Sequence, residues 1–525
     1  MLKQFADEFL GETLSLHPRH QNLLEDCDFG PTLEGETTSR TPEIASLDDV
    51  KFMYIKNIEI VGFRGFGKSQ KIELGIPNGK FGSGLTIIVG PNNSGKSTII
   101  EAFNAISREK AYSFPEGKRN KNAGDAISIK VKNTSNETKE LCTIDGEGGK
   151  AAWKENNIVE PISKIFVVPS RRYFKPFFGE GEITRDEFSS SKGTRNVYVS
   201  NQGNPTLRPS SLIGFEQRLF EIQENKIRFN EILNNILDPL PNWTIEMSDR
   251  DDWYLKFSYG DITHNSEGLG EGLISLFILV DALYDSKEGD VIVIDEPELS
   301  LHPQLQKKLI KLMGKYSQSR QVIIATHSPY FINWKSISNG AKITKLVKDI
   351  DGDIEVYQMA KKTVDSIEGL VNDLHNPHVM GLDACEIFFL EDNVVLVEGQ
   401  EDVIIYNKIL KDLKIELKGS FYGWGVGGAD KMSIIVGLLS DLGFKKVVGI
   451  LDGNKGGSKS KLEKNYPEYK FFIIKKDDVR DKTATKPSKK IDGLADHKGK
   501  IKPECEEHVR NLFSEVNSIF FPSSI

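Results

Sequence analysis

Cysteine is scarce in this sequence. Only four occur in 525 residues, Cys27, Cys142, Cys385 and Cys505, and no two form a C-x-x-C pair. Structural zinc sites and disulfide frameworks need cysteines at short spacings, so neither is predicted. A reducing compartment, the cytoplasm, is therefore the expected location.

Long apolar runs are absent as well. The longest lies between Leu273 and Val280 and is interrupted by Ser275. A membrane-spanning helix needs about 20 apolar residues. The first residues of the chain also lack the apolar core of a signal peptide. We therefore expect a soluble protein without membrane contact.

The sequence has no excess of positive charge, since its net charge is -8. Any surface that binds nucleic acid must therefore be local. No sustained heptad pattern occurs, which argues against a long coiled coil. The chain exceeds the size of one hydrophobic core, so two or three domains are expected.

A complete G-x-x-x-x-G-K-[ST] motif runs from Gly90 to Ser97, between a β-branched strand pattern and a helix pattern. In such a loop the backbone N–H groups favour an anion. Lys96 would face the outer phosphates, and the Ser97 hydroxyl would bind Mg²⁺. A glycine-rich turn without a ligand is the alternative. The predicted nucleotide contacts also include Gly90, Asn92, Asn93, Gly95 and Thr98.

Two later strands carry residues that fit nucleotide hydrolysis. An apolar strand ends in Asp295 and Glu296, and the next buried strand is followed by His327. Asp295 could hold the Mg²⁺ shell, Glu296 could position or deprotonate the attacking water, and His327 could contact the γ-phosphate. Taken singly, such an acid is usually a helix cap and such a histidine structural. Their order along the chain favours hydrolysis.

After about Gly381 strands and helices alternate, which predicts a parallel sheet. The predicted strands begin at Phe388, Lys445 and Phe471, and a single helix is predicted earlier, from Phe215 to Leu237. Parallel sheets collect their functional groups at the carboxyl ends of the strands. The groups expected to converge there are Glu398, Asp402, Asp452 and the pair Asp477 and Asp478.

Several acids at one edge repel each other unless cations share them, which argues for divalent metal with oxygen ligands. The alternative is that these acids only cap helices. Asn454 could add a carbonyl oxygen but no charge. The lysine-rich stretch from Lys455 to Lys502 offers a local DNA-binding patch and a cation for cleavage. Its candidates are Lys455, Lys459, Lys486, Lys489 and Lys490.

Five segments resemble the motifs of ABC-type ATPases of the SMC-like branch. They match the family's phosphate loop, signature motif, acidic strand motif, D-loop and switch histidine, in that order: Gly90–Ser97, SEGLGEG, VIVIDEPE, LSLHP and IIATHSP. This resemblance implies ATP at an interface between two copies of the chain. Ser266, Gly268 and Gly270 of one copy would close over ATP held by the other.

The segments LVEGQEDVIIY and ILDGN resemble the glutamate and D-x-D motifs of a Toprim domain. An SMC-like ATPase followed by Toprim resembles the OLD (overcoming lysogenisation defect) family of ATP-coupled nucleases, which includes anti-phage effectors. The resemblance implies that Glu398, Asp402 and Asp452 bind Mg²⁺ or Mn²⁺ for phosphodiester hydrolysis, with Glu398 and Asp452 catalytic. Asn454 replaces the second acid of D-x-D, and Asp477 or Asp478 could compensate.

The predicted fold is α/β, in three parts. A polar extension covers residues 1–50, an ABC-type ATPase with a dimerising helical insertion near 175–240 covers 51–385, and a Rossmann-like Toprim domain covers 386–525. The predicted function is an ATP-regulated, metal-dependent DNA endonuclease or nickase in anti-phage defence. The alternative is an ATP-driven sensor or scaffold that binds DNA or a partner without cleaving. A topoisomerase or primase ranks third.

The resemblance also implies partners for the chain. It would bind DNA and associate with itself as a dimer or tetramer. Some members of the OLD family work with a reverse transcriptase or a helicase, so a partner of either kind is expected.

Overall fold

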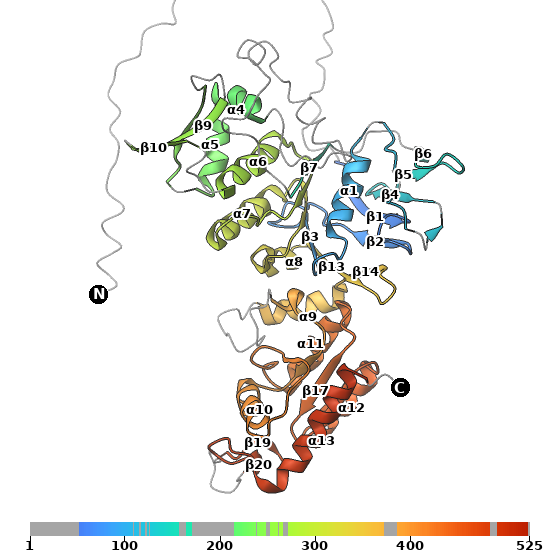
Figure 1. Cartoon of the computed structure of the whole chain (residues 1–525), viewed down its shortest axis with the longest axis vertical. Coiled ribbons are helices and arrows are strands. Elements are labelled where there is room, and N and C mark those ends of the chain that lie inside the picture. The colour runs from blue at the N-terminus through green and yellow to red at the C-terminus, as the bar shows by residue number, and fades with distance from the viewer. Residues whose placement is uncertain are drawn as a thin grey trace, which may run out of the picture. The chain divides into compact units, whose positions relative to one another are not determined.

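A computed structural model describes most of the chain from Phe52 onwards (Figure 1). The described residues are 52–108, 110–114, 117–120, 123–124, 126–156, 164–170, 215–237, 239–247, 253–260, 262–265, 271–371, 386–482 and 491–522. The predicted N-terminal extension and the signature residues Ser266, Gly268 and Gly270 lie outside them, as does residue range 175–214 of the predicted insertion.

A six-stranded sheet forms the centre of the first half, in the order β14-β13-β3-β12-β11-β7. Its strands are β3 (Leu85–Val89), β7 (Ile165–Val168), β11 (Val291–Asp295), β12 (Gln321–Ala325), β13 (Lys342–Lys348) and β14 (Ile354–Gln358). All neighbours pair in parallel except β13 with β14. The predicted phosphate-loop strand therefore lies inside the sheet, with a parallel neighbour on each side.

Both faces of this sheet are covered, which explains why its strands are apolar throughout. In β11, Val291 and Val293 join the core formed with helix α1 (Lys96–Ile106). The alternate residues Ile292 and Ile294 join the core formed with α6 (Glu271–Asp285) and α7 (Pro303–Tyr316). This layering fixes the carboxyl ends of β3, β11 and β12 at one edge.

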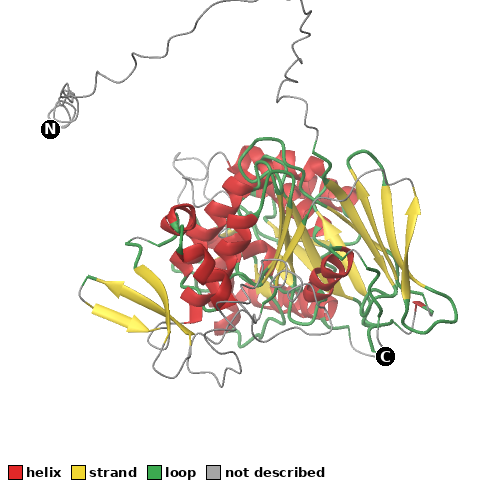
Figure 2. Ribbon diagram, turned by 90° about the horizontal axis from the view of Figure 1, so that it is seen from above, coloured by secondary structure: helices red, strands yellow, loops and turns green. Residues whose placement is uncertain are grey.

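Two antiparallel sheets accompany the central one. The first has the order β2-β1-β4-β5-β6 and the second the order β10-β9-β8. Strands are drawn yellow and helices red in Figure 2. The strands of the first are β1 (Ile55–Val61), β2 (Gln70–Glu73), β4 (Ser128–Asn133), β5 (Thr138–Thr143) and β6 (Ala151–Asn156). The strands of the second are β8 (Asn242–Met247), β9 (Trp253–Tyr259) and β10 (Ile262–Asn265).

The prediction of one helix from Phe215 to Leu237 is wrong. Two helices occupy this range, α4 (Phe215–Gln223) and α5 (Ile227–Asn234). The break places Lys226 before α5, where its ammonium donates to the Trp243 carbonyl oxygen (2.7 Å) and to Asn242 Oδ1 (3.0 Å). These tertiary contacts with β8 override the helical periodicity.

The second half contains the predicted parallel sheet, in the order β16-β15-β17-β18. Its strands are β15 (Val394–Leu396), β16 (Ser420–Phe421), β17 (Val447–Leu451) and β18 (Lys470–Ile473). The helices of this half are α10 (Gln400–Asp412), α11 (Ala429–Asp441), α12 (Gly456–Asn465) and α13 (Pro503–Phe520). Residues of α11 pack against one face of the sheet, and residues of α10 and α13 against the other.

Two predicted strands of this half have different limits. Phe388 lies in a 3-10 helix, η5 (Glu386–Phe389), where its ring packs against Trp334 with centroids 5.6 Å apart, and the strand begins only at Val394. The third strand ends at Ile473, and Asp478 instead begins β19 (Asp478–Arg480), which pairs with β20 (Gly493–Ala495).

One hydrophobic core joins the two halves. Ile87 and Val89 of the phosphate-loop strand belong to the same cluster of buried residues as Phe388, Met432 and Leu438. The connecting elements are η4 (Pro329–Phe331), α8 (Trp334–Ser338) and α9 (Lys361–Val371). Across the described part of the chain, no helix is both long enough and apolar enough to cross a bilayer.

Candidate functional site

The glycine-rich loop after β3 has the strained backbone that a phosphate cradle requires. Asn93 has φ 63° and Gly95 has φ 99°, both in the left-handed region. A Cβ at Gly95 would come within 2.1 Å of Ile354 Cδ1, and the left-handed φ itself favours glycine there. Helix α1 begins at Lys96, directly after the loop, and thus points its N-terminal N–H groups at the cradle.

Lys96 folds back over this loop. Its ammonium donates to the carbonyl oxygens of Gly90 and Pro91, each at 3.0 Å, and the residue is 5% exposed. Burial lowers the pKa of Lys96, and the nearby carboxylates of Glu296 and Asp295 act in the opposite direction. A nucleotide could compete for this ammonium, because two carbonyl oxygens bind it less strongly than phosphate does.

The buried hydroxyl of Ser94 supports the same interpretation of the loop. Its Oγ has no hydrogen-bond partner among the described residues. Buried polar groups are normally satisfied, and an unsatisfied donor at a phosphate cradle fits a bound oxygen. Asn92 is exposed, whereas Ser97 is partly and Thr98 fully buried at the start of α1.

The structure brings the predicted hydrolytic residues together beside this loop. Asp295 ends β11 and is 2% exposed, and Glu296 follows it with φ 48°. His327 follows β12, and its Nε2 lies 3.8 Å from Glu296 Oε1. Burial lowers the pKa of His327, the charge of Lys96 lowers it further, and Glu296 raises it. Glu296 and His327 are therefore adjacent in space although about 30 residues apart in the chain.

Glu298 is a residue that the motif analysis left without a role. Its carboxylate accepts hydrogen bonds from Thr326 Oγ1 (2.8 Å) and from the His327 backbone N–H (2.6 Å). Burial raises the pKa of Glu298. This carboxylate joins the carboxyl ends of β11 and β12 and thereby sets the position of His327. In the sequence, the run of acids after β11 is the pattern that could have identified Glu298.

A second group of acids lies where the parallel sheet of the other half changes direction. From β15 the chain passes to β16 on one side and then to β17 on the other, so the carboxyl ends of β15 and β17 flank a switch point. Glu398 follows β15 and Asp452 follows β17. The Asp452 backbone N–H donates to Glu398 Oε1 at 3.1 Å, which joins the two predicted catalytic acids.

Asp402 and Asp478 complete this carboxylate group. Asp402, in the first turn of α10, accepts a hydrogen bond from the Gly399 N–H at 2.9 Å. Burial, together with repulsion from Asp478 and Glu398, raises the pKa of Asp402 to about 6. Burial and the charges of Glu398, Asp402 and Asp478 raise the pKa of Asp452 to about 8. The structure therefore brings together Glu398, Asp402, Asp452 and Asp478, four of the five acids expected at this edge.

Lys482 is the cation that the structure brings to this group. Its ammonium lies 2.5 Å from Asp478 Oδ2 and 3.1 Å from Glu401 Oε2, and its charge lowers the pKa of both Asp402 and Asp452. The lysines that the sequence predicts for this role are different ones. Of those, Lys459 pairs with Glu463 at 3.5 Å, while Lys486, Lys489 and Lys490 lie outside the described residues.

Asn454 and Asp477, also predicted for this site, contact each other. The Asn454 side-chain amide donates to the Asp477 backbone carbonyl oxygen at 3.3 Å, which leaves its own carbonyl oxygen available. Within the described residues, no group of three or more His, Cys, Asp or Glu side chains is arranged to hold a metal ion. The carboxylates of Glu398, Asp402, Asp452 and Asp478 still suit a divalent ion, because a shared cation would relieve the repulsion between them.

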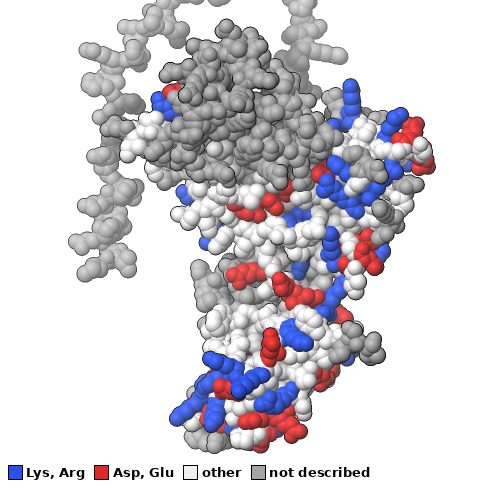
Figure 3. All heavy atoms as spheres, in the orientation of Figure 1, with Lys and Arg blue, Asp and Glu red and all other residues white. Residues whose placement is uncertain are grey.

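Basic side chains gather at the end of the molecule that carries β19 and β20 (Figure 3). Arg480 and Lys482, both from this region, form ion pairs with Glu401. Lys502 likewise pairs with Asp481 (2.7 Å) and Asp492 (2.6 Å). The predicted lysine-rich patch is thus interleaved with acids among the described residues.

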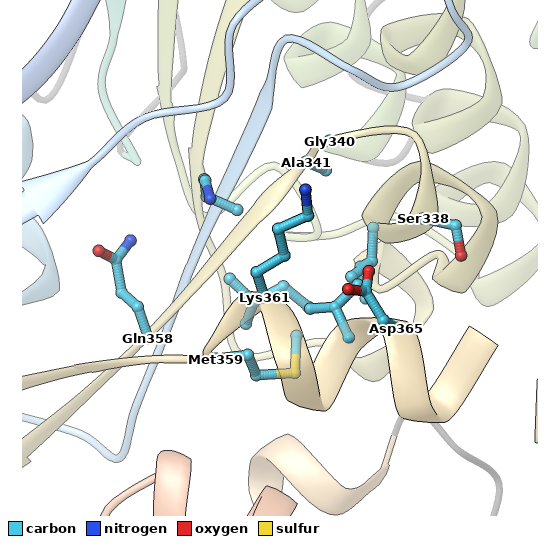
Figure 4. Close-up of a pocket in the computed structure, with 11 residues that line it drawn as sticks. Ser338, Gly340, Ala341, Gln358, Met359, Lys361 and Asp365 are labelled. Atoms are coloured by element: carbon cyan, nitrogen blue, oxygen red, sulfur yellow. The ribbon is translucent and has the colours of Figure 1, made fainter.

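A separate pocket of about 180 Å³ lies between α8, β13, β14 and α9. Lys361 points from α9 towards Gly340 and Ala341, and Asp365 lies one turn further along the helix (Figure 4). None of the residues that line it belongs to either group described above.

Two family models match the first half of the chain. One, described as "AAA ATPase domain", matches residues 53–148, and the other, "AAA domain, putative AbiEii toxin, Type IV TA system", matches residues 205–333. Both therefore support an ATPase, and the matched ranges contain the phosphate loop and the acidic strand motif.

Curated relatives extend the likeness along the chain. Septu protein PtuA of Bacillus thuringiensis is 25% identical over 63% of this chain and 85% of the relative. An OLD nuclease of Thermus scotoductus is 22% identical over 69% of this chain and 77% of the relative. Endonuclease GajA of Bacillus cereus is 26% identical over 37% of this chain and 32% of the relative. These similarities support a relationship with the OLD-like ATPase–nucleases.

Proposed function

We propose that this protein is an ATP-regulated, divalent-metal-dependent DNA endonuclease or nickase that acts in anti-phage defence. The observation that carries the proposal is the meeting of Glu398 and Asp452 at the switch point of the parallel sheet. The relatives named OLD nuclease and endonuclease GajA support the same activity. In this proposal residues 51–385 form the ATPase and residues 386–525 a Toprim nuclease.

The nuclease reaction would be hydrolysis of a phosphodiester. Water attacks phosphorus, one P–O bond to deoxyribose breaks, and the leaving oxygen takes a proton. Mg²⁺ or Mn²⁺ would activate the water and offset charge on the phosphate. Glu398, Asp402 and Asp452 would hold it, with oxygens of Asn454 and Asp478 as further ligands.

The ATPase site would regulate this reaction. Lys96 would bind the outer phosphates of ATP, and Ser97 and Asp295 would hold its Mg²⁺. Glu296 would orient the attacking water, and His327, held by Glu298, would contact the γ-phosphate. A second copy of the chain would contribute Ser266, Gly268 and Gly270, so self-association belongs to the proposal. DNA is the proposed substrate, and a reverse transcriptase or helicase the proposed kind of partner.

Asn454 favours a second candidate function. Because it supplies no charge where the Toprim pattern has an acid, one metal position is weakened. The protein would then be an ATP-driven sensor or scaffold that binds DNA or a partner without cleaving.

Cleavage of supercoiled plasmid with Mg²⁺ or Mn²⁺, with and without ATP, tests the proposal. Wild type should yield nicked or linear DNA, Glu398→Ala should yield none, and Lys96→Ala should lose the response to ATP. EDTA, which removes the divalent metal, should abolish cleavage under every condition. Intact plasmid under all conditions, together with measurable ATP hydrolysis, would favour the scaffold instead.

A further inference from the structure

A short glycine-rich loop between β16 and α11 runs along the strand that carries Glu398. Backbone N–H groups of the loop donate to carbonyl oxygens of β15 and its continuation. Tyr422 donates to Val395, Val426 to Val397 and Gly428 to Glu398, at 2.9, 2.9 and 2.7 Å. The loop is therefore fixed to the backbone of the carboxylate site.

The loop packs directly against the backbone beside Glu398. A Cβ at Gly425, which has φ 84°, would lie 2.6 to 2.7 Å from backbone atoms of Gly399. Real Cβ atoms do not come this close, so glycine is required at this position. Gly399 lies between Glu398 and the first residue of α10.

Trp424 projects from this fixed loop into solvent. Its neighbours Tyr422 and Val426 are fully buried at 0% exposure, whereas Trp424 is 55% exposed. A tight turn, in which the Gly425 N–H donates to the Tyr422 carbonyl oxygen at 2.9 Å, holds the tryptophan at its tip. No other ring or cation stacks on Trp424 among the described residues.

The exposed ring of Trp424 offers an apolar face on which a flat ligand could stack. Trp243 and Trp334, for comparison, are buried at 0% and 6% exposure. Aromatic side chains beside nuclease sites can stack on unpaired bases, because every base has a π-face. A rigid indole loses little conformational freedom on binding, so stacking on it is favourable.

We propose that Trp424 stacks on an unpaired base of the DNA strand held at the Glu398–Asp452 site. This inference rests on the proposed nuclease function and adds the substrate class: a strand with at least one unpaired nucleotide at the site. Binding would then favour single-stranded, flapped or locally opened DNA over continuous duplex.

The test uses the full-length Glu398→Ala protein, so that bound DNA stays intact, with Ca²⁺ present. The probes are a fluorescein-labelled oligothymidylate and a strand of equal length and charge that lacks bases. Trp424→Ala should weaken binding of the thymidine strand by about tenfold, as loss of one stacked base predicts. It should leave binding of the abasic strand unchanged, and Trp424→Phe should retain most of the affinity.

Matched measurements keep the result interpretable. Ile227 of α5 is an apolar residue that is 71% exposed. Ile227→Ala should leave the affinity for the thymidine strand and for the abasic strand unchanged. Equal losses on both strands, or no loss on the thymidine strand, would overturn the stacking role. A lower mass in sedimentation for Trp424→Ala would overturn it in favour of a contact between copies of the chain.

Failure of this inference is separable from failure of the nuclease proposal. If wild type cleaves plasmid but Trp424→Ala binds both strands as its parent does, only the stacking role is wrong. If wild type never cleaves and binds neither strand, both proposals are wrong.

Discussion

The ammonium of Lys482 contacts two carboxylates, those of Glu401 and Asp478. Its charge also acts on Asp402 and Asp452. A cation in this position could offset the negative charge that develops on a phosphate during hydrolysis. At the scale of single residues, Lys482 is therefore the group whose removal is most informative.

Lys482→Ala should lower the rate of plasmid cleavage by about 100-fold, as loss of one preorganised electrostatic group does in other enzymes. Lys482→Arg keeps a positive charge and should restore part of the rate. The measurement is single-turnover cleavage with Mg²⁺, alongside ATP hydrolysis, which should not change in either variant.

Lys411→Ala serves as the control for this prediction, because Lys411 is an exposed lysine near the end of α10. Its cleavage rate should equal that of wild type. Equal rates for Lys482→Ala and Lys411→Ala would show that Lys482 only stabilises the local fold.

At the scale of elements, a buried ionic cluster fixes α4 to α6. Arg218 of α4 donates to Asp281 at 3.2 Å and to Asp285 at 2.8 Å, both on α6, and lies 3.8 Å from Glu221 of its own helix. The arginine is 9% exposed. Because α6 directly follows the predicted signature residues, this cluster links the helical region to the segment expected to meet ATP.

Arg218→Met should lower the free energy of unfolding by about 3–5 kcal/mol, because it removes the arginine that pairs with the buried Asp281 and the half-buried Asp285. Urea denaturation measures the change. Arg228→Met, at an exposed position of α5, is the control and should cost less than about 1 kcal/mol. A loss in Arg218→Met no larger than in this control would show that the cluster is not stabilising.

At the scale of the whole molecule, the two halves meet around a buried lysine. Lys345 of β13 lies beside Val89 of the phosphate-loop strand and is 7% exposed. Its ammonium lies 3.5 Å from the centroid of the Phe444 ring, which belongs to the second half. Burial lowers the pKa of Lys345 to about 7, and Asp392 opposes the shift. Lys445 and Glu355 form an ion pair across the same junction at 3.1 Å.

This lysine predicts how stability depends on pH. Above about pH 7 Lys345 is neutral in the folded protein. In the unfolded chain the same ammonium has its ordinary pKa of 10.5 and stays protonated up to about that pH. The unfolded state thus binds more protons in this window, so stability rises with pH, by at most about 1.4 kcal/mol per unit. Below about pH 7 Lys345 is protonated in both the folded and the unfolded state, so its contribution to the free energy of unfolding no longer changes with pH.

Lys345→Met should therefore stabilise the protein near neutral pH and flatten its pH dependence between about pH 7 and about pH 9. Urea unfolding of wild type and variant at both values measures the effect. Lys348→Met, an exposed lysine of the same strand, should keep the slope of wild type. An unchanged slope in Lys345→Met would contradict the prediction.

The sequence by itself determined the features that depend on local spacing. The G-x-x-x-x-G-K-[ST] spacing places Lys96 and Ser97 at the start of a helix whatever surrounds them. Uninterrupted apolar runs marked β11 and β12 as strands covered on both faces, and so indicated where Asp295 and His327 would lie. Alternation of strand and helix predicted the parallel sheet that brings Glu398 and Asp452 together.

Only the tertiary structure decided the features that depend on contacts between distant segments. Glu298 reaches His327 because β11 and β12 end at one edge of the sheet. Lys482 reaches Glu401, about 80 residues away in the chain, because α10 lies beside β19. The separation of β19 from β18 and the break between α4 and α5 follow from packing that no local pattern encodes. The burial of Lys345 needs both halves of the molecule, since Phe444 that covers it lies about 100 residues further along the chain.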